Sequence, residues 1–246
     1  MSDADEVVST RRRAGAVLVV CLLAFLVGQV AATILIVIAA ALVHYPGGLS
    51  ALARADSPPW WANALSLVGL WIGFGLAVAY ASGPRGIGRL PDAWRVRKSD
   101  VLYVVLGAAC QLGVALVYAP FHVRGLSRPT HHLFDAASGA SLALLGVMTC
   151  LFAPLLEEWF FRGVVFRALE AAGGGPSALA TAGAAVLSAL LFALAHAEAL
   201  QFAGLALLGM VLAYLVARTR RLVPSVITHA SFNSVAFAAL LVQRSR

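Results

Sequence analysis

The chain has 246 residues, of which 61% are hydrophobic and only 12% are charged, and its mean hydropathy is +0.88. Soluble domains are typically about 45–50% apolar and about 25% charged, so this composition excludes an ordinary soluble domain and predicts an integral membrane protein. The net charge of +7 is compatible with binding to nucleic acid. The basic residues, however, gather in alternate connections between apolar runs, so we expect no nucleic-acid partner.

Seven strongly apolar runs without Asp, Glu, Lys or Arg follow one another along the chain. Most are near the length of about 20 residues that a helix needs to cross the hydrocarbon core. The predicted fold class is therefore all-α, a polytopic membrane helix bundle of about seven transmembrane helices. The predicted spans are residues 14–43, 60–82, 101–121, 138–156, 178–195, 200–217 and 223–242.

The distribution of lysine and arginine predicts the orientation. Thirteen of these residues fall on the side of the N-terminal tail and five on the other side, an asymmetry typical of cytoplasmic loops. We expect the N-terminus in the cytoplasm and the C-terminus outside, in a bacterial plasma membrane. Arg11–Arg13 precede the first run as in a signal peptide, but that run is longer than a cleaved signal, so a retained anchor is expected.

Candidate chemistry is confined to the last four spans. Residues 1–135 form a predicted N-terminal tail with three spans of unassigned role, and residues 136–246 form a predicted catalytic membrane core. Cys21, Cys110 and Cys150 all fall inside spans without metal-type spacing, so they are expected to be small packing residues and not disulfides.

Glu157 and Glu158 end the fourth run and are followed by Arg162. An acidic side chain at the bilayer centre costs about 2.5–3.5 kcal/mol, so such residues are rare and usually functional. In a helix, Glu158 and Arg162 lie four residues apart and can pair on one face. Glu157 is then turned away by about 100° and can face the interior unpaired. Alternatively, the group marks a helix leaving the membrane.

Histidines on two later spans complete the polar set. His196 follows the fifth run, one turn after Phe192, which is expected to pack beside it. His229 and Asn233 are four residues apart and share one face of the seventh span. Taken singly, His196 is typical of the membrane interface, and the His229–Asn233 pair is typical of a hydrogen bond between helices.

Together these groups can hydrolyse a carbonyl compound. A carboxylate and an imidazole can hold and deprotonate one water, directly or through a metal. A second imidazole and a carboxamide can donate hydrogen bonds to the oxyanion that forms. The predicted centre is Glu157, His196, His229 and Asn233, supported by Glu158, Arg162 and Phe192.

The order Glu-Glu-x-x-x-Arg, Phe-x-x-x-His and His-x-x-x-Asn resembles the CPBP intramembrane proteases. This family includes the type II CAAX prenyl endopeptidases and the bacterial Abi, bacteriocin-immunity and lysostaphin-resistance-like proteins. The resemblance covers roughly residues 138–242. It implies that the protein cleaves a peptide bond of a membrane-associated peptide or protein, either prenylated and CAAX-type or bacteriocin-like, and that Glu157, His196, His229 and Asn233 form the active centre.

The family is commonly called a metalloprotease, but the sequence leaves the role of a metal open. Glu157, His196 and His229 are residue types that can ligate one zinc ion. The same side chains can instead position a water in a metal-free glutamate mechanism. The oligomeric state is also left open by the sequence.

Two rival functions come from a different class. The polar residues can line the path of a small transporter, or form a structural network in a non-catalytic immunity or scaffold protein. Transporters usually show repeated halves with broken helices, and the sequence shows no such repeat. A protease requires the four centre residues around one cavity, whereas scattered residues favour the rivals.

Three details of the prediction depend on how the helices are placed. With the predicted spans, Glu157 and His196 lie at opposite membrane depths. Either the fourth helix runs on towards Glu170, or the fifth helix is tilted or starts late. Glu198 is expected to be a solvated loop residue or to line the entrance to the centre. Gln111 is expected to bridge helices.

Overall fold

The computed structural model describes residues 3–88, 90–123 and 125–245, and these form helices without a strand. Seven of the helical segments there are long and apolar enough to cross a membrane, which confirms the predicted class. Arg89, Arg124 and Arg246, counted above for the orientation, lie outside the described residues. Six spans contain one main helix each: α1 (Asp3–Leu42), α3 (Trp60–Ser82), α4 (Leu102–Tyr118), α9 (Ala178–Ala195), α10 (Phe202–Thr219) and α11 (Val223–Arg244).

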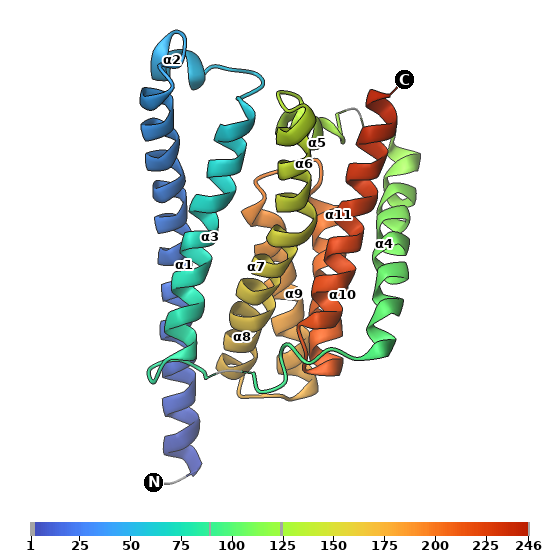
Figure 1. Ribbon diagram of the computed structural model, residues 1–246. Coiled ribbons are helices and arrows are strands. Elements are labelled where there is room, and N and C mark those ends of the chain that lie inside the picture. Colours follow the sequence, from blue (N-terminus) through green and yellow to red (C-terminus); the bar gives the residue numbers. More distant parts are fainter. Residues whose placement is uncertain (1–2, 89, 124, 246) are drawn as a thin grey trace.

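The spans stand side by side, with the two ends of the chain at opposite ends of the bundle (Figure 1). The lower end in that view carries the N-terminus and the connection between α3 and α4. The upper end carries the C-terminus and two short helices. The short elements are α2 (Gly48–Leu52), α5 (Arg128–Phe134), and the 3₁₀ turns η1 (Lys98–Val101) and η2 (Ala119–Phe121).

The fourth span is one continuous helical segment, Gly139–Ala172, and is longer than the predicted residues 138–156. It contains two π-helical stretches, on either side of the turns that carry the two glutamates. Pro154 has no N–H for the usual bond to the carbonyl of Cys150, which accounts for a widened turn before it. The parts are α6 (Gly139–Val147), η3 (Met148–Phe152), α7 (Ala153–Phe160), η4 (Phe161–Phe166) and α8 (Arg167–Ala172).

The length of this span resolves the mismatch in depth. At about 1.5 Å per residue, Glu157 lies about 22 Å along the helix from its end at Ala172. Helix α9 starts at Ala178, as predicted, and its 18 residues carry the chain about 27 Å to His196. The prediction that the fourth helix runs on towards Glu170 is therefore confirmed.

Small residues allow α1 and α3 to pack closely. A Cβ added at Gly69 would overlap the backbone of Ala32, and one added at Gly73 would overlap the carbonyl of Ala24. Close approach of this kind is the usual way in which membrane helices associate. The pair α1–α3 also contacts α7 and α8, so the first spans support the helix that carries the glutamates.

The core next to the two glutamates consists of aromatic side chains. Phe74 of α3 stacks on Phe160 at 4.3 Å between ring centroids. Phe161 then meets Phe192 of α9 edge-on at 5.4 Å. These rings are all buried, and they join three spans into one rigid layer next to the site.

A buried ion pair closes the lower end of the bundle. Arg221, between α10 and α11, donates to both carboxylate oxygens of Asp100 at 2.7 and 2.9 Å. The backbone N–H of Arg97 donates to Oδ2 of the same carboxylate, and Arg221 also donates to the carbonyl of Arg95. The bonds to Asp100 raise the pKa of the Arg221 guanidinium above its usual value. The pair fastens the α3–α4 connection to the turn before α11.

Candidate active site

A cavity of about 560 Å³ lies between the fourth span and helices α4, α5, α10 and α11. It reaches the end of the bundle that carries α5, because residues of α5 and the last turns of α11 are among its walls. All four residues of the predicted centre line it, so the structure brings them together instead of scattering them. The polar side chains that form the candidate site in this cavity are Gln111, Glu157, His196, Glu198, His229 and Asn233.

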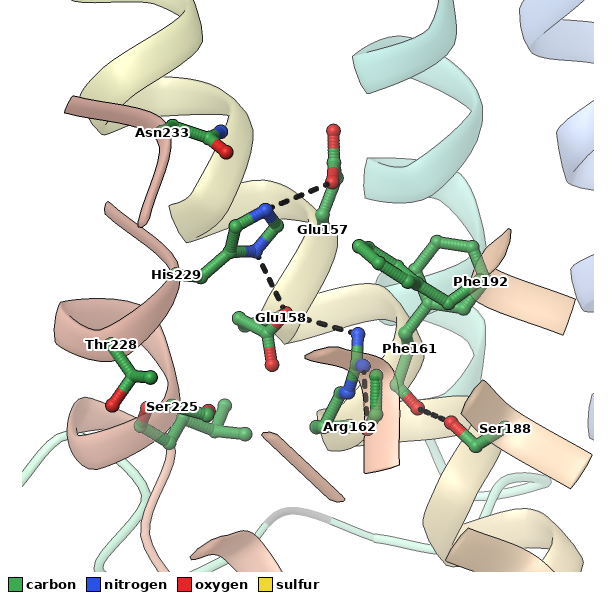
Figure 2. Close-up of polar contacts among 12 residues, drawn as sticks. Glu157, Glu158, Phe161, Arg162, Ser188, Phe192, Ser225, Thr228, His229 and Asn233 are labelled. Carbon is green, nitrogen blue, oxygen red and sulfur yellow. Dashed lines mark hydrogen bonds and ion pairs between the residues drawn. The ribbon is translucent and has the colours of Figure 1, made fainter. Parts of the chain in front are cut away.

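Glu157 points from α7 towards two imidazole rings. Its Oε2 lies 3.9 Å from Nε2 of His196 and 3.9 Å from Nε2 of His229. The same Oε2 is buried and has no hydrogen-bond partner among the described residues. Figure 2 shows the carboxylate and the His229 ring facing each other from different helices. The separations are too long for direct hydrogen bonds but leave Oε2 and both ring nitrogens around one small space.

The other nitrogen of each ring is held in place. Nδ1 of His196 lies 2.8 Å from the carbonyl oxygen of Phe192. Nδ1 of His229 lies 3.1 Å from Oε1 of Glu158. Both partners are acceptors, so each Nδ1 carries the proton and donates it. In the neutral rings, the lone pair of each Nε2 is therefore directed towards Glu157.

Glu158 and Arg162 pair on one helix face, as predicted. Arg162 donates to Oε1 of Glu158 at 3.0 Å, and both side chains are completely buried. A second guanidinium nitrogen donates to the carbonyl of Gly209 on α10, and the group lies 4.5 Å from the centroid of the Phe192 ring. Glu158 accepts from both Arg162 and His229 (Figure 2), so it links the arginine to the imidazole.

Phe192 lies beside His196, as predicted, with 4.6 Å between ring centroids. It also contacts the ring of His229 at 5.5 Å, which the sequence did not indicate. One aromatic side chain thus borders both imidazoles and restricts their motion.

Asn233 lines the cavity and also bridges two spans. Its Nδ2 donates to the carbonyl of Thr149 at 2.9 Å, and Thr149 belongs to η3. The carbonyl oxygens of a π-helical stretch are displaced from regular pairing, so this bond stabilises the widened turn. The carboxamide has a second N–H for which no partner is found within the described residues.

Two further polar residues lie in the cavity wall. Gln111 of α4 was expected to bridge helices, but its buried Oε1 has no hydrogen-bond partner in the described part of the chain. Glu198 lines the cavity just after His196, which agrees with the second of its two expected positions. For Gln111, the available signal was a polar side chain within an apolar run; its direction could not be inferred without the packing of α4 on α11.

The side chains at the centre are of the right type for zinc, but their spacing is not. Zinc bonds of about 2.0–2.1 Å in a tetrahedron place neighbouring donor atoms about 3.3 Å apart. Glu157 Oε2 lies 3.9 Å from each ring nitrogen, and the described residues contain no group of three His, Cys, Asp or Glu side chains that could hold a metal ion. As positioned, the residues do not fit zinc.

The fold and the cavity define an integral membrane protein with a carboxylate and two imidazoles buried inside its helix bundle. Residues 139–235 match the family model described as type II CAAX prenyl endopeptidase Rce1-like. This segment is therefore similar to the Rce1-like type II CAAX prenyl endopeptidase family, which confirms the resemblance seen in the motifs. The similarity suggests an intramembrane protease. No curated protein and no solved structure matches the chain.

Proposed function

We propose that the protein is an intramembrane endopeptidase in which Glu157 deprotonates a water molecule. The observation that carries the proposal is the position of the buried Oε2 of Glu157, at 3.9 Å from Nε2 of both His196 and His229. One water between these atoms comes within hydrogen-bond distance of the carboxylate and of a ring nitrogen. Because the water has two hydrogens, it can donate to Glu157 and to His196 together.

The reaction is a general acid–base hydrolysis. Glu157 removes a proton from the water as its oxygen attacks the carbonyl carbon of the peptide. This forms a tetrahedral intermediate with negative charge on the former carbonyl oxygen. When the intermediate collapses, the C–N bond breaks and the proton held by Glu157 passes to the leaving amine. Glu157 is regenerated and a carboxylic acid is released.

His229 and Asn233 stabilise the oxyanion in this proposal. Donation from Nε2 of His229 to the oxyanion requires a proton on that nitrogen while Nδ1 donates to Glu158, and Asn233 supplies its second N–H. Such donors are most effective where water is excluded. The burial of His229 and the bond from Asn233 to Thr149 support this role because both restrict the motion of the donors.

The substrate is a membrane-associated peptide or protein. On the orientation proposed from the basic loops, the N-terminus is cytoplasmic. The end of the bundle that the cavity reaches, with α5 and the C-terminus, then faces the outside. This favours a bacteriocin-like or other externally accessible peptide over a cytoplasmic prenylated CAAX protein.

The test compares wild-type protein with Glu157→Gln in lipid vesicles. Two probes are supplied, a farnesylated CAAX peptide and an unmodified hydrophobic membrane peptide, and the products are identified by mass spectrometry. Glu157→Gln is expected to lower turnover by about 10²–10⁴-fold. Glu170→Gln is the control, because Glu170 lies on the same span and is buried but pairs with Arg220 instead. Equal turnover in wild type and Glu157→Gln contradicts the mechanism.

Two further measurements separate the alternatives. If neither probe is cleaved by folded wild-type protein, the non-catalytic or transport functions are favoured. Metal analysis of active protein, combined with a chelator assay, distinguishes zinc-dependent from glutamate-only chemistry. A stoichiometric metal whose removal abolishes turnover would show that the side chains at the centre move together to bind it.

A further inference from the structure

A second cavity, of about 580 Å³, lies at the opposite end of the bundle from the proposed active site. Its walls come from α1, residues 83–88, the end of α8, the turn before α9 and the end of α10. Three arginines and one glutamate line it: Arg13, Arg167, Arg220 and Glu170. We call this the arginine cavity.

The negative charge of Glu170 is already neutralised. Arg220 donates to its two carboxylate oxygens at 2.8 and 3.4 Å. The hydroxyl of Thr181 donates to Oε1 at 2.6 Å. This carboxylate and Arg220 balance each other, so the remaining charge of the arginine cavity comes from Arg13 and Arg167.

Arg167 is partly buried and makes no ion pair within the described residues, and the nearby Glu170 carboxylate is already paired with Arg220. It donates to backbone carbonyls of Gly88 at 3.0 Å, Gly163 at 3.3 Å and Ile87 at 3.5 Å. These bonds fix the guanidinium between α8 and residues 83–88 while leaving its positive charge uncompensated. A partly buried charge without a counter-ion is costly, so an anion that enters the cavity is stabilised there.

Arg13 supplies the second uncompensated charge from α1. Its side chain is exposed and makes no hydrogen bond or ion pair within the described ranges. Thr10, one turn earlier on the same helix, also lines the cavity and offers a hydroxyl donor. The opposite wall includes Gly88 and Gly175, whose φ values of 75° and 95° are readily adopted by glycine.

We propose that the arginine cavity binds a phosphate-bearing anion, such as the headgroup of an anionic lipid or a soluble phosphate compound. The planar guanidinium matches the oxygens of a phosphate and binds them with two parallel hydrogen bonds. The volume lies within the range of ligand sites, about 300–1,000 Å³. Its place at the basic end of the bundle is where anionic headgroups meet basic pockets between membrane helices.

The bound anion would connect elements that are distant in the sequence. Arg13 lies on α1, and Arg167 lies on the span that also carries Glu157. A phosphate held by both residues links α1 to α8 and, through the carbonyl contacts of Arg167, to residues 83–88. Binding is therefore expected to raise the unfolding temperature of the whole protein. This inference does not depend on the proposed peptidase activity.

Native mass spectrometry of the full chain in detergent tests the proposal. The probes are dioctanoyl phosphatidylglycerol, dioctanoyl phosphatidylcholine and inorganic phosphate. We expect one tight site for phosphatidylglycerol and weaker binding of the zwitterionic lipid. Competition by inorganic phosphate at similar concentration identifies a soluble phosphate compound as the ligand, and failure to compete identifies a lipid headgroup.

Two neighbouring arginines provide a matched pair of variants. Arg13→Gln removes a charge-assisted hydrogen bond and is expected to weaken phosphatidylglycerol binding by about tenfold. Arg12→Gln removes the same charge from the adjacent position of α1, outside the cavity wall, and is expected to leave affinity unchanged. Neither side chain has a hydrogen bond to lose, so both variants should fold. Equal loss in the two variants, or no preference of the wild type for the anionic lipid, overturns the proposal.

Discussion

Two buried arginine–carboxylate pairs in this protein differ in how completely they are satisfied. Asp100 uses both oxygens for Arg221 and also accepts from a backbone N–H. Glu158 uses one oxygen for both Arg162 and His229, and its Oε2 is buried without a partner among the described residues. In the first pair both carboxylate oxygens have partners, whereas in the second pair one oxygen also accepts from an imidazole and the other has no partner among the described residues.

The surroundings of the two pairs explain the difference. The Asp100–Arg221 pair is enclosed by the backbone of the α3–α4 connection and does not line either cavity described above. The Glu158–Arg162 pair is adjacent in sequence to Glu157, whose unpaired Oε2 faces the cavity of the candidate active site. In this protein, the buried pair next to the candidate site is the one that also holds a group lining a cavity, the His229 ring.

We expect the largest effect on stability from a substitution in the Asp100–Arg221 pair. Asp100→Ala leaves the Arg221 guanidinium buried without its counter-ion, and breaking a buried pair in this way costs about 3–5 kcal/mol. Reversible unfolding in mixed micelles should show this loss. Turnover per folded molecule should not change, because the pair does not touch the centre.

Asp92→Ala is the matched control for this prediction. Asp92 lies in the same connection and carries the same charge, but its side chain is exposed. Its removal should leave the unfolding free energy nearly unchanged. If Asp100→Ala instead lowers turnover while stability is retained, the two pairs are not functionally distinct.

Asn233→Ala should mainly affect turnover. Loss of one oxyanion donor typically lowers the rate by about 10²–10³-fold. Loss of the bond to Thr149 should reduce stability by only about 0.6 kcal/mol, the average for such contacts between membrane helices. Ser234→Ala is the control, because that hydroxyl bonds within its own helix to Ala230. A loss of stability with unchanged turnover would show that Asn233 contributes to helix packing and not to catalysis.

Glu158→Gln tests whether the second pair positions His229. We expect turnover to fall by about 10–100-fold, the range found for carboxylates that orient metal-binding histidines. We expect a fall in kcat with KM nearly unchanged, because Glu158 orients the His229 ring without lining the cavity itself. Glu170→Gln breaks a different Glu–Arg pair on the same span and should leave kcat unchanged. An equal fall in kcat in both variants would indicate damage to the fold alone.

Much of this arrangement could be predicted because it follows from local spacing. The four-residue separation of Glu158 and Arg162 places them on one helix face, and the apolar runs give the spans directly. The spacing of Phe192 and His196 likewise predicted their contact. These inferences need only the geometry of a single helix.

The rest depends on contacts between helices. The bond from His229 to Glu158 joins α11 to α7, and no spacing within either segment indicates it. The predicted fourth span is shorter than the observed one because charged residues after Glu157 resemble a membrane boundary. These side chains remain inside the bundle because their partners come from other helices, as the carbonyl of Gly209 does for Arg162. The inward position of Gln111 has the same origin.

The smallest effect is expected at the junction between α9 and η4. The hydroxyl of Ser188 donates to the carbonyl of Phe161 at 3.2 Å (Figure 2), at the start of a π-helical stretch. Ser188→Ala leaves that buried carbonyl without this donor and should lower the unfolding free energy by about 1 kcal/mol. Ser225→Ala is a suitable control, because its equally buried hydroxyl bonds locally to Leu222 and spans no interface. A loss for Ser188→Ala that is no larger than the loss for Ser225→Ala would mean that the π-helical stretch is stable without the bond from α9. A larger loss for Ser188→Ala would show that a neighbouring helix stabilises the stretch that carries Arg162.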